Sequence, residues 1–144
     1  MNLGYILLVE DNMNDAELTI RALKKCGLKH PIIHLQDGEM ALNHLINENK
    51  PLEVQSNRPL VIILDINMPK INGLEVLKIL KSNVIAKLIP IVIFTSSMEN
   101  RDLAEAYDLG VNSYVVKPVN YDKFTQAITQ LANYWIKLNR PPIV

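Results

Sequence analysis

The strongest constraint on the fold is an alternation, repeated five times, between a short apolar run and a longer segment of helical periodicity. The apolar runs are residues 5–9, 31–35, 60–64, 90–94 and 113–116. The helical segments are residues 14–26, 40–46, 72–80, 99–109 and 120–138. Continuous apolar runs are typical of strands that are covered on both faces. The alternation therefore predicts an α/β fold in which a parallel sheet lies between two layers of helices.

Length and charge narrow the class of protein. A chain of 144 residues has the usual size of one domain. Its 15 basic and 15 acidic residues give a net charge of zero, so no excess of positive charge favours binding to nucleic acid or to an anionic membrane. The residues before the first strand do not resemble a signal peptide, and no apolar run approaches the roughly 20 residues that span a bilayer. We therefore expect a cytoplasmic protein without direct contact to nucleic acid or membrane.

Two segments fall outside the alternation. Residues 47–59 are polar and contain Pro51 and Pro59, which predicts a surface loop. Residues 138–144 contain Pro141 and Pro142, which stop a helix, so we expect a short C-terminal tail. We expect residues 1–144 to form a single domain that carries this loop and this tail.

Polar residues of complementary chemistry follow four of the apolar runs. In an open parallel sheet, ligands bind outside the carboxyl ends of the strands. Any one polar residue at such a position is more often a turn residue, a helix cap or a salt-bridge partner. Here several arrive together at neighbouring strand ends, which predicts one shared site. The residues are Glu10 and Asp11 after the first run, Asp65 and Asn67 after the third, Thr95 after the fourth and Lys117 after the fifth.

The carboxylates of this set would repel one another at close range and raise one another's pKa. A hard divalent cation removes that conflict, and oxygen ligands of this kind suit Mg2+. Lys117 adds a positive charge and Thr95 adds a hydroxyl donor. A carboxylate nucleophile beside Mg2+, a lysine and a hydroxyl suits phosphoryl transfer, in which charge develops on the transferred oxygens. The pattern predicts that Asp65 accepts a phosphoryl group with Mg2+ as cofactor.

The motifs at these strand ends resemble the receiver domain of the response-regulator family, the aspartate-phosphorylated half of two-component signalling. The matching segments, in family order, are residues 6–12, 64–69, 72–73, 94–97 and 114–118. They extend over nearly the whole chain. The resemblance implies a CheY-like fold, that is, a doubly wound, flavodoxin-like (βα)5 sandwich with five parallel strands in the order 2-1-3-4-5.

The resemblance also implies a role for each residue of the site. The implied metal ligands are Glu10, Asp11, Asp65 and Asn67, with Glu10 acting through water. The groups implied to act in phosphoryl transfer are Asp65, Thr95 and Lys117. The implied conformational switch residues are Thr95 and Tyr114, and the peptide bond between Lys117 and Pro118 is expected to be cis. Glu10 departs from the aspartate found in many receivers, but the carboxylate is retained, so we expect little effect.

By the same resemblance, the chain is a phosphorylation switch and no enzyme in the usual sense. A sensor histidine kinase or a phosphotransfer protein donates the phosphoryl group, and the face of the fourth helix, fifth strand and fifth helix then changes shape. The domain would catalyse only its own phosphorylation and dephosphorylation. The loop at 47–59 and the tail with Trp135 resemble single-domain regulators that partner phytochrome-type kinases. We expect such a kinase, and a homodimer through the C-terminal face that includes Trp135.

Two other functions stay open at the level of sequence. An aspartate-based phosphohydrolase also uses an aspartate at a strand end. That class places an acid/base aspartate two residues later, where this chain has Asn67, and its nucleophile follows the first strand of the fold. An interaction module that is never phosphorylated is the other alternative, and the intact set of acidic residues, hydroxyl and lysine argues against it.

Overall fold

The computed structural model describes residues 4–46 and 58–142. The strands are β1 (Tyr5–Val9), β2 (Ile32–Leu35), β3 (Pro59–Leu64), β4 (Ile91–Thr95) and β5 (Ser113–Val116). The helices are α1 (Met13–Lys25), α2 (Gly38–Leu45), α3 (Gly73–Lys81), α4 (Asn100–Asp108) and α5 (Tyr121–Ala132). A 3-10 turn, η2 (Ala86–Leu88), precedes β4, and a π-helical segment, η3 (Asn133–Leu138), continues α5. Every strand and helix predicted from the periodicity is present, with ends shifted by a few residues.

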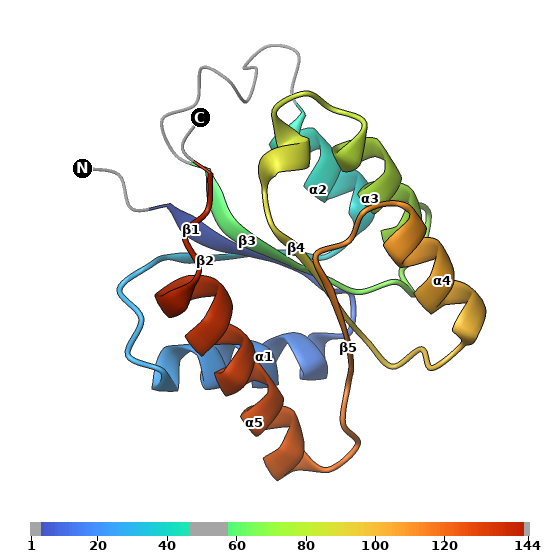
Figure 1. The fold of residues 1–144 in the computed structure, drawn as a ribbon. Coiled ribbons are helices and arrows are strands. Elements are labelled where there is room, and N and C mark those ends of the chain that lie inside the picture. Colours follow the sequence, from blue (N-terminus) through green and yellow to red (C-terminus); the bar gives the residue numbers. More distant parts are fainter. Residues whose placement is uncertain (1–3, 47–57, 143–144) are drawn as a thin grey trace.

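The five strands form one parallel sheet in the order β2-β1-β3-β4-β5. Helices α1 and α5 cover one face of the sheet, and α2, α3 and α4 cover the other (Figure 1). The predicted doubly wound (βα)5 sandwich and its strand order are therefore confirmed. Because the strands are parallel, all their carboxyl ends lie along one edge, where a ligand site is expected.

Side-chain caps fix where most of the helices begin. In each capped case an Asn or Asp side chain accepts a hydrogen bond from the backbone N–H three residues later, which satisfies a donor that the helix itself leaves unpaired. The capping residues are Asn12 for α1, Asp37 for α2, Asn72 for α3 and Asn120 for α5. Asn12 directly follows Glu10 and Asp11, and Asn72 ends the loop that begins with Asp65, so both caps also fix the loops that carry the predicted site.

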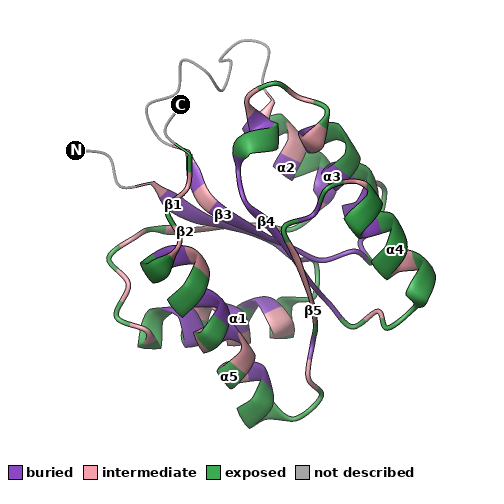
Figure 2. Ribbon diagram, viewed as in Figure 1, coloured by how far each residue is buried: buried purple, intermediate pink, exposed green. Residues whose placement is uncertain are grey.

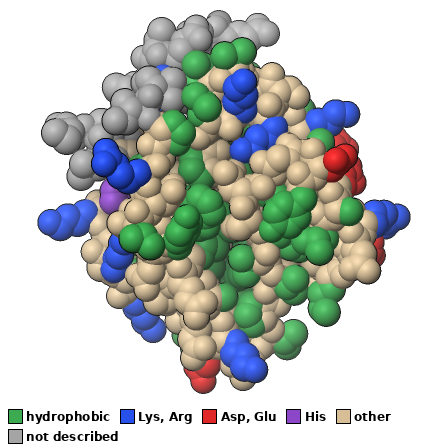
Figure 3. All heavy atoms as spheres, viewed as in Figure 1, with side chains coloured by type: hydrophobic (Ala, Val, Ile, Leu, Met, Phe, Trp, Pro, Cys, Tyr) green, Lys and Arg blue, Asp and Glu red, His purple; other side chains and the backbone are tan. Residues whose placement is uncertain are grey.

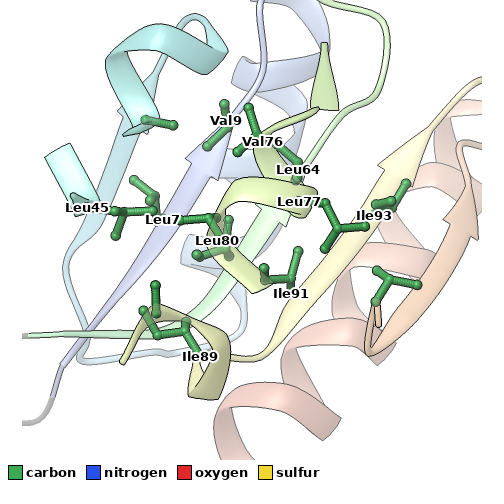
Figure 4. Packing of buried hydrophobic residues seen from close by; sticks show 14 of the residues in the cluster. Leu7, Val9, Leu45, Leu64, Val76, Leu77, Leu80, Ile89, Ile91 and Ile93 are labelled. Carbon is green, nitrogen blue, oxygen red and sulfur yellow. The ribbon is translucent and has the colours of Figure 1, made fainter. Parts of the chain in front are cut away.

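Two hydrophobic cores lie on opposite faces of the sheet, and alternate residues of a strand enter different cores. In β1, Leu7 and Val9 join the core under α2, α3 and α4, whereas Ile6 and Leu8 join the core under α1 and α5. Figure 4 shows the first core, in which Leu7 of β1 lies beside Leu80 and Val9 beside Val76, both of α3. Figure 2 shows the buried band running along the sheet between the two exposed helix layers.

Two predicted segments, the surface loop and the C-terminal tail, lie partly outside the residues that the structure describes. Most of the predicted surface loop at 47–59 lies outside the described residues, and β3 already begins at its last residue, Pro59. Of the predicted tail at 138–144, Leu138 still belongs to η3 and residues 139–142 follow it. Within residues 4–46 and 58–142, no helix is both long enough and apolar enough to cross a membrane.

Candidate functional site

Three carboxylates meet at the carboxyl edge of the sheet. Glu10 and Asp11 follow β1, and Asp65 follows the neighbouring strand β3. One oxygen of each of the three side chains lies within 4.8 Å of the others. Glu10 and Asp65 are buried, whereas Asp11 is exposed at the mouth of the cluster. The structure thus brings together the acidic residues that the sequence pattern predicted.

Backbone pairing between the strands holds these residues in place. The Asp65 N–H donates to the Val9 carbonyl at 3.1 Å, which continues the β1–β3 ladder into the site. The Glu10 N–H donates to the Leu35 carbonyl at 3.1 Å, and the Asn12 N–H donates to Glu10 Oε2 at 3.1 Å. These three hydrogen bonds therefore hold the turn that carries Glu10 and Asp11 in place.

Lys117 reaches the cluster from the end of β5 and contacts three carboxylates at once. Its Nζ lies 2.6 Å from Glu10 Oε1, 2.9 Å from Asp15 Oδ2 and 3.1 Å from Asp65 Oδ2. Burial disfavours the charged ammonium, but hydrogen bonds to Asp15 and Glu10 and the charge of Asp65 outweigh it, so the pKa of Lys117 is raised. Lys117 is therefore a permanent positive charge inside the site.

The pKa of Glu10 indicates whether the site fits a divalent cation. Burial, together with the negative charge of Asp65, raises the pKa of Glu10 to about 7, although Lys117 acts in the opposite direction. The single lysine thus leaves the acidic cluster short of positive charge. A cation with a preference for carboxylate oxygens would supply it, and Glu10, Asp11 and Asp65 offer the matching donor set. The residues present fit Mg2+ as the predicted cofactor.

Thr95 lies at the end of β4, next to β3, and Tyr114 lies on the following strand of the sheet, β5. Thr95 is completely buried at the end of β4, and its Oγ1 accepts a hydrogen bond from the Ser97 N–H at 3.3 Å. The Tyr114 hydroxyl donates to the Ser97 carbonyl at 3.0 Å, and its ring packs against the core under α2, α3 and α4. In this structure Tyr114 therefore points inward, and one loop residue, Ser97, connects it to Thr95.

Asn67, two residues after Asp65, is exposed. It lines an open pocket together with Ser96, Ser97 and Asp102. Nearby, the close packing of Gly73 against the Asp65 carbonyl fixes the loop that follows β3, because a Cβ at Gly73 would overlap that oxygen. The Gly73 N–H also donates to the Ile66 carbonyl at 2.8 Å, which closes the loop.

The prediction of a cis peptide between Lys117 and Pro118 was wrong for this structure. No peptide bond among the residues that the structure describes is cis. For a bond before proline the two isomers differ by only about 0.5–1 kcal/mol, with trans the more stable, so the surrounding structure decides between them. The Lys117 side chain reaches all three carboxylates with a trans bond.

The sequence interpretation missed two residues of the site, Asp15 and His34. Asp15 lies in the first turn of α1, where an acidic residue is an ordinary helix-stabilising feature, so the sequence carried no sign of its contact with Lys117. His34, on β2, donates from Nε2 to the Glu10 carbonyl at 2.8 Å. A histidine within a short strand carries no sequence signal that separates this role from a surface position.

Comparison with known proteins gives the same picture. The family model "Response regulator receiver domain" matches residues 6–129. The probable methanogenesis regulatory protein FilR2 of Methanothrix harundinacea is 36% identical over 138 residues, which cover 95% of this chain and 86% of that protein. Response regulator Rcp1 of Synechocystis is 36% identical over 132 residues, which cover 92% of this chain and 88% of Rcp1.

Solved structures agree closely in fold. The phosphorylated cyanobacterial phytochrome response regulator RcpA has a TM-score of 0.88 at 32% identity, covering 97% of this chain and 99% of RcpA. The Mn(2+)-bound form of response regulator Rcp1 has a TM-score of 0.87 at 34% identity, covering 97% and 99% of the two chains. From the family match over most of its length, together with the strand order and the acidic cluster at the strand ends, this chain belongs to the response regulator receiver domain family.

Proposed function

We propose that this receiver domain works as a phosphorylation switch, in which Asp65 accepts a phosphoryl group from a histidine kinase with Mg2+ bound. The observation that carries the proposal is the position of Asp65. It is 6% exposed, its Oδ2 contacts Lys117, and Glu10 and Asp11 lie within metal-binding reach. The two related structures, phosphorylated RcpA and Mn(2+)-bound Rcp1, support the same chemistry.

The residues present have distinct parts in the transfer. A carboxylate oxygen of Asp65 attacks phosphorus as the N–P bond to the donor histidine breaks, and the histidine nitrogen keeps the electron pair and later takes a proton. Glu10, Asp11, Asp65 and the Asn67 carbonyl would hold Mg2+, which supplies charge neutralisation of the phosphoryl oxygens when bound. Lys117 donates to another phosphoryl oxygen from the side of β5.

Thr95 and Tyr114 connect the site to the surface. We propose that the Thr95 hydroxyl turns toward the phosphoryl group, which changes the loop at Ser97 to which Tyr114 donates. The face of α4, β5 and α5 is where this change would be read. Its exposed apolar residues include Leu103, Tyr107 and Val116, and Figure 3 shows hydrophobic side chains gathered over the middle of this face. A partner that prefers one loop conformation would shift the balance between the two states.

Phosphorylation of the intact protein tests the proposal. We expect incubation with Mg2+ and a small phosphodonor to add one phosphoryl group, seen by mass spectrometry as an acid-stable, base-labile adduct. Asp65→Asn should abolish the adduct. The matched control is Asp37→Asn, because Asp37 is a helix cap at the end of another strand and should leave the adduct in place.

Other outcomes would contradict the proposal. Steady turnover of varied phosphate esters would indicate a phosphohydrolase instead. Complete absence of an adduct, together with no Mg2+-dependent binding of a phosphoryl mimic, would indicate an interaction module that is not phosphorylated. An adduct that persists in Asp65→Asn would place the acceptor on another residue.

The identity of partners remains a prediction. A phytochrome-type kinase is suggested by the name of the related RcpA. A homodimer through the C-terminal face was predicted with Trp135 as an anchor, but Trp135 is half-buried and packs against its own core, while Tyr134 and Leu138 are exposed. We propose that these two side chains extend the apolar part of any such interface. The single-domain organisation and the cytoplasmic location also stay predictions.

A further inference from the structure

The contact between Asp15 and Lys117 is the feature of the site that phosphoryl transfer does not require. Lys117 carries an ammonium group, which has three N–H donors and no acceptor. The structure gives it carboxylate acceptors on Glu10, Asp15 and Asp65 at 2.6, 2.9 and 3.1 Å. All of its donors are therefore engaged before any phosphoryl group is present.

The acceptors differ in how easily they can be released. The side chains of Lys117, Glu10 and Asp65 are only 7%, 3% and 7% exposed, whereas that of Asp15 is 28% exposed. Taking Lys117 away from Glu10 or Asp65 would leave a buried carboxylate without its cation, which is costly. Taking it away from Asp15 costs less, because water can hydrate the carboxylate that is released.

Asp15 is also held by its own backbone rather than by Lys117. Its N–H donates to the side chain of the α1 cap, Asn12, at 3.0 Å, and its carbonyl accepts from the Thr19 hydroxyl at 2.7 Å. Loss of the contact to Lys117 therefore leaves the first turn of α1 intact. Conversely, Lys117 remains held by Glu10 and Asp65 when Asp15 is removed, so its position over the site does not depend on Asp15.

We propose that Asp15 is a positioning residue that competes with the phosphoryl group for Lys117 and so favours the unphosphorylated state. The inference rests on the proposed function of Asp65. When a phosphoryl oxygen takes a hydrogen bond from Lys117, the contact to Asp15 is the one that breaks. The Asp15 carboxylate also places a negative charge near the incoming group, and its repulsion acts in the same direction.

The test compares two variants of one helix in the full chain. Asp15→Asn removes the competing charge. Glu17→Gln removes the same charge two residues further along α1, where Glu17 forms an exposed pair with Arg21 at 2.6 Å and 61% exposure. The readout is the affinity for beryllofluoride, a phosphoryl mimic, at saturating Mg2+, followed by NMR of the backbone amides. Mg2+ affinity is measured separately.

We expect Asp15→Asn to bind beryllofluoride about two- to fivefold more tightly than the wild type, the range of a partly screened ion pair, with no gain in Mg2+ affinity. Glu17→Gln should match the wild type. The gain should vanish when Asp15→Asn is combined with Lys117→Gln, because Asp15 acts through Lys117. A structure of the beryllofluoride-bound wild type, which needs no variant to fold, should show Lys117 separated from Asp15.

Several results would overturn the inference. These are weaker or equal beryllofluoride binding by Asp15→Asn, an equal gain in Glu17→Gln, and an intact Lys117–Asp15 contact in the bound structure. Failure of the proposed function gives a different result, since a wild type that binds no beryllofluoride at all removes the phosphorylation switch and this inference with it.

Discussion

Strands β3 and β5 each deliver a residue to the same site, but they are held very differently. β3 is paired on both sides, with β1 and β4, and nearly all of its residues are buried. β5 is one of the two edge strands, paired only with β4, and its residues are half-buried or exposed (Figure 2). Asp65 thus follows a buried central strand, whereas Tyr114 lies on an edge strand and Lys117 directly follows it.

This difference places the proposed phosphoacceptor, Asp65, after a central strand and the proposed switch residue, Tyr114, on an edge strand. A nucleophile needs a fixed position, because misplacement of reacting groups reduces the rate strongly. A switch needs an element that can change its packing at low cost, and such elements are drawn from the less stable parts of a fold. The sheet supplies both a fixed position and a movable element, since the carboxyl ends of central and edge strands lie side by side.

The largest expected effect tests the difference in burial directly. Ile62→Ala on β3 removes a fully buried side chain and should lower the free energy of unfolding by about 4 kcal/mol. Val115→Ala on β5, whose side chain is partly buried, should cost only about 1 kcal/mol. Equilibrium urea unfolding of both variants checks this, and equal losses would break the comparison between central and edge strands.

The loop after β3 should be nearly as sensitive as the strand. Gly73→Ala places a methyl group against the Asp65 carbonyl, so we expect a loss of about 3 kcal/mol and reduced phosphorylation of Asp65. The control is Gly27→Ala, since Gly27 has a positive φ of 70° but open space around it, and should cost about 1 kcal/mol with phosphorylation unchanged. Similar losses in the two variants would show that packing against Asp65 is unimportant.

A smaller effect is expected on the side of β5. Tyr114→Phe removes the hydrogen bond to the Ser97 carbonyl but keeps the ring, and should cost about 1 kcal/mol or less. Tyr107→Phe on the exposed surface of α4 serves as the control. NMR of the amides around Ser97 should show the loop changed in the first variant only, and an unchanged loop would remove Tyr114 from the connection to Thr95.

The smallest effect concerns the pH dependence of stability and involves Tyr5 on β1 and His44 on α2. The Tyr5 hydroxyl, whose pKa burial raises to about 12, forms a hydrogen bond with His44 Nε2 at 2.8 Å. Burial lowers the pKa of His44, so the unfolded chain binds the proton more readily. Stability from this group is complete above the unfolded pKa of about 6.5 and falls as the pH drops below it.

Thermal unfolding between pH 7.5 and 5, compared with His44→Gln, measures this contribution. The variant should show a weaker loss of stability toward low pH than the wild type. An identical pH dependence of the two proteins would show that His44 does not titrate differently in the fold.

The sequence determined most of the architecture because local patterns and global fold agree. The apolar runs, their alternation with helices, and caps such as Asn12 and Asn72 each specify an element without reference to distant residues. The shared location of the site residues at strand ends followed once the strands were parallel, and the roles that the family resemblance implies for them stay predictions. These residues are Glu10, Asp11, Asp65, Thr95 and Lys117.

Tertiary structure alone decided which groups touch. Whether Lys117 reaches Asp15 as well as Glu10 and Asp65 depends on where the fold brings the first turn of α1 relative to the end of β5, and no local signal encodes a contact across 102 residues. The same holds for His34 on the Glu10 carbonyl. The isomer of the bond before Pro118 is also set by its surroundings, because the intrinsic preference is small. The strand-end residues of the site were thus predictable from local pattern, whereas packing between distant elements decided their contacts and brought Asp15 and His34 to the site.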